Sequence, residues 1–75
     1  MKNPAKAYET GEMLLNQFDM DMASLYFESA GDSYLEIGNR EDAVKAYEQF
    51  LYCAKMLGKD ELAKRAKEKL AHATN

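Results

Sequence analysis

The sequence predicts an all-α fold of four helices that form two antiparallel helical hairpins within a single domain, residues 1–75. One proline and four glycines among 75 residues leave little room for loops. Apolar residues recur every three or four positions, which is the spacing of one helix face. Features also recur twenty residues apart, so that Gly38 matches Gly58 and Phe27 matches Tyr47. Twenty residues hold one helix and a tight turn, and helices joined this closely pack as antiparallel neighbours.

The first helix is predicted over residues 4–17. Asn3 is a favourable N-cap, and Pro4 suits the first helical position because its missing N–H is not needed there. A glycine inside a helix costs about 1 kcal/mol relative to alanine, so Gly11 indicates a close approach of a neighbouring helix. The apolar face of this helix is expected to contain Tyr8, Gly11, Leu15 and Phe18.

The second helix is predicted over residues 20–37, with either Asp19 or Asp21 as its N-cap. Gly31 indicates another close crossing, and Gly38 is expected to take the left-handed conformation that ends a helix. The apolar stripe of this helix repeats every three or four residues and consists of Ala23, Phe27, Ala30, Tyr34 and Ile37.

The third helix, residues 40–57, begins after the N-cap Asn39 and ends at Gly58. Its middle, residues 50–54, is apolar on all sides, which indicates neighbours on more than one side and a central place in the stack. Cys53 lies in this stretch and is interpreted as a small buried hydrophobic residue. The fourth helix, residues 60–73, starts near Asp60 and has a thinner stripe of mostly small residues, as expected of the last element in a stack.

One run of residues matches a known repeat in register. It consists of Phe27, Ala30, Gly31, Tyr34, Gly38, Ala43 and Tyr47. This run resembles the tetratricopeptide repeat, and residues 31–50 look most like the repeats of soluble NSF attachment proteins. The resemblance implies a right-handed stack of helical hairpins, and a scaffold or adaptor whose groove holds a peptide or helix. No proline ends the second helix of the pair, and Phe50 stands where the pattern has a small residue.

The residues contain no recognisable catalytic, cofactor-binding or metal-binding motif, so we expect no enzyme and no cofactor. Residues 1–54 carry four basic and ten acidic side chains, whereas residues 55–75 carry six basic and three acidic ones. The acidic body argues against nucleic-acid binding, and the basic residues of the tail are interpreted as the solvated face of the last helix. No stretch has the apolar length of a membrane span, and one cysteine without a signal peptide predicts a cytoplasmic protein.

The expected function is therefore non-catalytic binding of a peptide or helix from a protein partner. The alternative is a self-assembling unit, a homodimer through the first helix or the apolar flank of the third, because stacks of this kind usually need at least three repeats. Methionine and tyrosine suit adaptable interfaces, and the groove of the resembled family implies the exposed side of residues 20–37. The candidate partner-binding residues are Tyr26, Ser29, Ser33, Glu36, Met13, Met20 and Met22.

Overall fold

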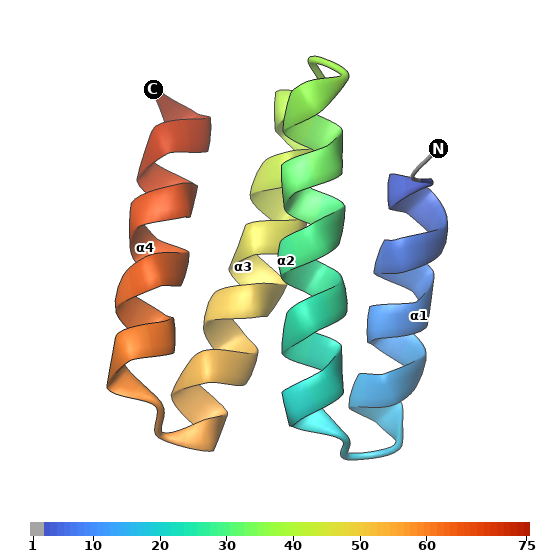
Figure 1. The fold of residues 1–75 in the computed structure, drawn as a ribbon, viewed down its shortest axis with the longest axis vertical. Coiled ribbons are helices and arrows are strands. Elements are labelled where there is room, and N and C mark those ends of the chain that lie inside the picture. The colour runs from blue at the N-terminus through green and yellow to red at the C-terminus, as the bar shows by residue number, and fades with distance from the viewer. Residues whose placement is uncertain (1–2) are drawn as a thin grey trace.

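The computed structural model describes residues 3–75, and the regular secondary structure of this part consists of four α-helices and no strand. They are α1 (Pro4–Asn16), α2 (Met20–Glu36), α3 (Arg40–Leu57) and α4 (Asp60–Thr74). The helices run alternately up and down, and the main contacts join each helix to its neighbour in the sequence (Figure 1). The all-α prediction is confirmed, with each predicted helix end within one residue of the observed one.

Capping side chains explain where three of the helices begin. The side chains of Asn3, Asp19 and Asn39 accept hydrogen bonds from the backbone N–H three residues later. Asp19 is therefore the N-cap that the sequence left open between two aspartates. Lys59 precedes α4 without such a side-chain bond, and the acidic residues Asp60 and Glu61 stand in its first turn, where the helix dipole favours them.

The three turns share one backbone conformation, at positions twenty residues apart. Phe18, Gly38 and Gly58 have φ of 62°, 79° and 69°, and the N–H of the following residue bonds back to a carbonyl in the last turn of the helix. This is the usual left-handed helix ending, which favours glycine because a Cβ is strained there. Phe18 adopts this left-handed conformation although it has a Cβ. The prediction that Phe18 lies on the apolar face of the first helix is wrong, because the helix ends at Asn16 and the Phe18 side chain is 86% exposed.

Two glycines allow adjacent helices to approach closely, as their sequence positions predict. A Cβ on Gly11 would lie 2.9 Å from the Phe27 ring, and a Cβ on Gly31 would lie 2.3 Å from the Tyr47 ring. Each glycine thus meets an aromatic residue sixteen positions later, and the second pair repeats the first after twenty residues. The same contact therefore joins α1 to α2 and α2 to α3, whereas Leu51 and Lys67 occupy the equivalent positions on α3 and α4.

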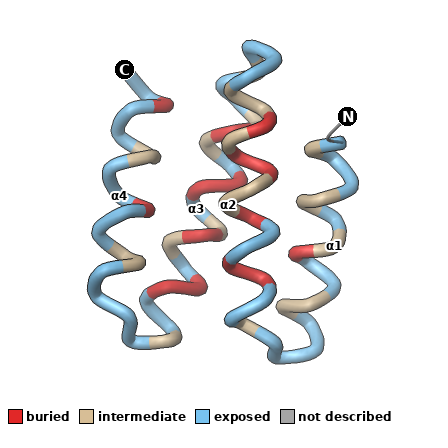
Figure 2. The backbone as a smooth tube through the Cα atoms, viewed as in Figure 1, coloured by how far each residue is buried: buried red, intermediate tan, exposed pale blue. Residues whose placement is uncertain are grey.

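The core lies mainly between α2 and α3, which contribute six buried residues each (Figure 2). Phe27, Tyr47, Phe50 and Cys53 are its largest apolar members, each no more than 1% exposed. Burial of each large side chain contributes roughly 1.5–3 kcal/mol. The third helix has neighbours on two sides, as predicted, since α3 packs against both α2 and α4. It shares this position with α2, and Tyr52 within its apolar middle is 48% exposed. The molecule measures only 30 × 24 × 16 Å, so every helix keeps a large exposed side.

Candidate functional site

An exposed apolar stripe runs along α2. Met22, Leu25 and Tyr26 follow one another at helical spacing and are 42%, 54% and 37% exposed. Together with Ser29, one turn further on, they line an open hollow of about 260 Å³. These four residues form what we call the α2 face. Large apolar side chains that gather around a hollow at the surface indicate a site of association.

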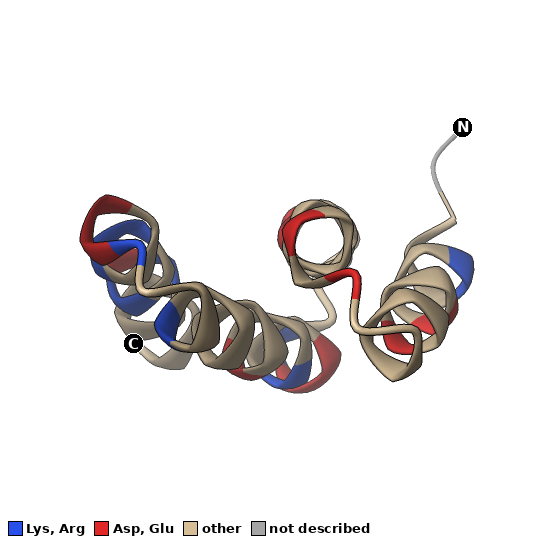
Figure 3. Cartoon of the chain, turned by 90° about the horizontal axis from the view of Figure 1, so that it is seen from below, with Lys and Arg blue, Asp and Glu red and all other residues tan. Residues whose placement is uncertain are grey.

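The packing of α2 fixes the direction of this face. Phe27 and Gly31 hold α2 against α1 and α3, and Ala23 and Ala30 are fully buried on the same side. Seen end-on, α2 is displaced from the line of α1 and α3, so one side of it has no helix against it (Figure 3). Because residues three, four and seven apart share a side of a helix, the α2 face is presented together and away from the core.

The structure brings together three of the seven predicted partner-binding residues, namely Met22, Tyr26 and Ser29. Glu36 is exposed at the end of the same helix, Met13 is 53% exposed on α1, and Met20 is half-buried. Ser33 is only 5% exposed, so the expectation that it lies on the exposed side of α2 is wrong. Leu25 was not among the predicted residues. Its spacing of three from Met22 was the signal that could have found it.

Ion pairs join α4 to α2, its second neighbour along the chain. Arg65 Nε and Lys69 Nζ each lie 2.9 Å from Glu28 Oε2, and Lys69 Nζ also lies 3.0 Å from Asp32 Oδ1. The interpretation of the basic tail as a solvated face is therefore only partly right. The acidic body was the signal that could have predicted these ion pairs, since residues 7–39 contain seven acidic side chains and no basic one.

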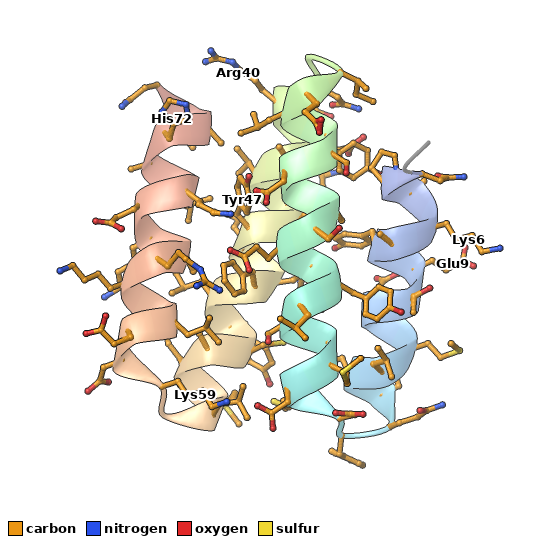
Figure 4. All side chains as sticks on the ribbon, viewed as in Figure 1. Lys6, Glu9, Arg40, Tyr47, Lys59 and His72 are labelled. Carbon is orange, nitrogen blue, oxygen red and sulfur yellow. The ribbon has the colours of Figure 1, made fainter. Side chains whose placement is uncertain are left out.

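A further pair lies near the turn between α3 and α4. Lys59 Nζ is 2.7 Å from Asp21 Oδ1, and Figure 4 shows the Lys59 side chain directed toward the start of α2. Both side chains are more than half exposed, at 56% and 65%. Exposed pairs of this kind contribute less than about 1 kcal/mol, so this aspartate is easily approached by another cation.

A second hollow, of about 330 Å³, lies between α2, α3 and α4, where Figure 4 labels Tyr47 and His72. The Tyr47 hydroxyl donates to Asp32 at 2.5 Å, and burial together with this hydrogen bond raises the pKa of Tyr47. Burial alone would lower the pKa of Lys69, but hydrogen bonds to Glu28 and Asp32 raise it. Tyr47 is thus a neutral phenol and Lys69 an ammonium at neutral pH. Neither group is prepared to act as a base or a nucleophile.

Cys53 is buried on α3, and a further hollow lies along α4. Burial raises the pKa of Cys53, which keeps this enclosed side chain a thiol. A hollow of about 700 Å³ lies along α4, but it is lined by exposed charges of both signs and by a single large apolar residue, Leu62. Among residues 3–75, no three histidine, cysteine or acidic side chains lie close enough together to hold a metal ion.

No helix in the described part of the chain combines the length and apolar character needed to cross a membrane. We compared the chain with protein-family models, with curated protein sequences and with solved structures. None of the three comparisons found a match, so the similarity to tetratricopeptide repeats stays a prediction from the residues.

Proposed function

We propose that the protein is a non-catalytic interaction module that binds a peptide or helix of a protein partner on the α2 face. The observation that carries this proposal is the exposure of Met22, Leu25 and Tyr26 around one hollow, on the side of α2 opposite the core. Covering such side chains contributes roughly 25 cal/mol per Å² of apolar surface. Methionine and tyrosine add adaptability and contact area at low entropic cost.

The similarity to tetratricopeptide repeats supports the same proposal. The pairing of Gly11 with Phe27 recurs twenty residues later as Gly31 with Tyr47, and consecutive helices make the main contacts. Arrays built in this way present extended surfaces to partners. We therefore propose a scaffold or adaptor built on a helical repeat, with its recognition surface on the helix that both glycine contacts hold in place.

Self-assembly is the second candidate, and a different surface favours it. Tyr52 and Met56 lie one turn apart on α3 and are 48% and 59% exposed. A symmetric dimer could cover this pair of side chains on the flank of the third helix. Such a dimer would leave the α2 face free, so the two candidates predict different contacts for two tyrosines.

Photo-crosslinking from these tyrosines tests the proposal. A benzophenone amino acid replaces Tyr26 in one variant and Tyr52 in a matched control. Both tyrosines are partly exposed, Tyr26 on α2 and Tyr52 on α3. We expect the Tyr26 variant to crosslink to another protein, and we expect that protein, once purified, to bind the chain and to lose binding to Leu25→Asp. Crosslinks from Tyr26 to a second copy of the chain alone would contradict the proposal. Crosslinks to a second copy from Tyr52 alone would support the dimer.

A further inference from the structure

We infer that the partner segment recognised by the α2 face is an amphipathic helix with apolar anchors on one side and lysine or arginine at their flanks. This inference rests on the proposed function and adds the chemistry of the partner. It follows from the charges around the face, from the way in which α2 already holds α4, and from the surfaces that a second copy could offer.

The surroundings of the α2 face are acidic. Residues 7–39 contain no lysine, arginine or histidine, and α2 carries only acidic charges (Figure 3). Asp19 at the N-cap and Asp21 in the first turn are exposed, with Asp21 in a weak, exposed pair with Lys59. Glu36 is exposed in the last turn, seven residues beyond Ser29 and thus on the same side. A partner that covers the apolar centre therefore meets carboxylates at both ends, and opposite charge there favours encounter and orientation.

The molecule contains one example of the charge pairing in this recognition. The helix α4 turns a stripe of small apolar residues toward the core, with Ala66 and Ala73 buried. Two cations of α4 and the lysine just before it reach carboxylates of α2. Lys59, Arg65 and Lys69 pair with Asp21, Glu28 and Asp32, respectively. The carboxylates of α2 thus already pair with cations of a basic amphipathic helix that itself packs against α3, while the apolar side of α2 lacks a partner among the described residues.

A second copy is the poorer occupant. Two α2 faces brought together would place Asp19, Asp21 and Glu36 of both copies in one interface, and like charges in apposition are unfavourable. The exposed side of α4 has the right charge in Lys64 and Lys67, but none of its exposed residues is a large apolar side chain. Neither surface offers both the anchors and the cations. The flank of α3 has the anchors Tyr52 and Met56, but exposed carboxylates, Glu41 and Glu48, stand on the same helix as its lysines and would face those of α2.

The experiment measures the binding of two synthetic helical peptides by fluorescence anisotropy. Both are about eighteen residues long with leucines at the spacing of one helix face. One has lysines at both flanks and the other has glutamates at the same positions. We expect the lysine peptide to bind at least about tenfold more tightly at low salt, and we expect added salt to reduce this ratio.

Two pairs of variants locate the site. Leu25→Ser removes an anchor from the α2 face, and Tyr52→Ser is its control on α3. Glu36→Lys reverses a charge beside the face, and Glu48→Lys makes the same change in net charge at an exposed position of α3. We expect Leu25→Ser and Glu36→Lys each to weaken the lysine peptide by about threefold or more, with the controls within about twofold of the parent.

Equal binding of the two peptides, no binding of the lysine peptide at concentrations up to about 1 mM, or equal effects of Glu36→Lys and Glu48→Lys would overturn the inference. The proposed function is tested separately, by the crosslinking experiment from Tyr26. A non-basic partner captured at Tyr26 that depends on Leu25 would support the interaction module while refuting the basic helix.

Discussion

The glycine contact between α2 and α3 leads to the sharpest prediction. In Gly31→Ala, the new Cβ would lie 2.3, 2.6 and 2.8 Å from three atoms of the Tyr47 ring. Carbon atoms in good contact lie about 3.5–4.0 Å apart, so the ring or the helix must shift by more than about 1 Å. Tyr47 is 1% exposed and its hydroxyl bonds to Asp32, so a shift of the ring, even toward the hollow that it borders, disturbs its core packing and this hydrogen bond.

The expected net loss follows from three contributions to the free energy of unfolding. Alanine gains about 1 kcal/mol over glycine within a helix. Overpacking of a filled core costs about 1–3 kcal/mol, and loss of the hydrogen bond to the Asp32 carboxylate costs about 1.5–3 kcal/mol more. Gly31→Ala should therefore destabilise the protein by about 1.5–5 kcal/mol, which is a large part of the roughly 5 kcal/mol expected for a domain of this size.

Urea denaturation followed by far-ultraviolet circular dichroism measures this loss. The control is the same substitution in a Tyr47→Leu background, where the ring is absent and Gly31→Ala should lie within about 1 kcal/mol of neutral. Gly11→Ala should be milder, because its Cβ would lie 2.9–3.1 Å from the Phe27 ring. If Gly31→Ala stabilises the protein in the natural background, the close contact of α2 with α3 is refuted.

Three further predictions concern the turn, the core and alkaline pH. Phe18→Gly should stabilise the protein by about 0.5–1 kcal/mol in urea denaturation, because glycine relieves the left-handed backbone; a loss of stability would mean that the exposed ring contributes to the fold. Phe50→Ala should cost about 3–5 kcal/mol in the same assay, and a loss below about 1 kcal/mol would contradict its burial. Because burial and the Asp32 hydrogen bond raise the pKa of Tyr47 above its usual value of about 10, the stability that its protonated form contributes is present below about pH 10 and is lost as the pH rises further. Tyr47→Phe should therefore make the fall of the urea midpoint above about pH 10 shallower than in the parent, and an unchanged slope would refute this reasoning.

The helices could be predicted because residues close in the sequence determine where each helix begins and ends. Asn3, Asp19 and Asn39 accept capping hydrogen bonds, and Gly38 and Gly58 take the left-handed turn for which glycine is suited. Phe18 misled the prediction because the same turn formed without a glycine to signal it. The backbone hydrogen bonds of the turn, and not the preference of its residue, determined the conformation there.

The surface of the molecule was harder to predict than its core. Met22 and Tyr26 could be proposed from residue type and spacing. Ser33 also has the spacing of this side of the helix, seven residues beyond Tyr26, and yet it is buried. The pair of Lys69 with Asp32 joins residues 37 positions apart on helices that are not consecutive. Such contacts depend on how far long side chains reach across a third helix, which no local pattern in the sequence specifies.

The central claim is that the α2 face is free in the protein alone and available to a partner. Sedimentation equilibrium from about 1 to about 500 µM tests it most directly, with Leu25→Asp as the variant and Tyr52→Asp as its control. We predict that Leu25→Asp leaves the apparent mass unchanged at every concentration. A dimer of the parent protein that Leu25→Asp dissociates, and Tyr52→Asp does not, would show that a second copy covers the α2 face and would contradict the claim.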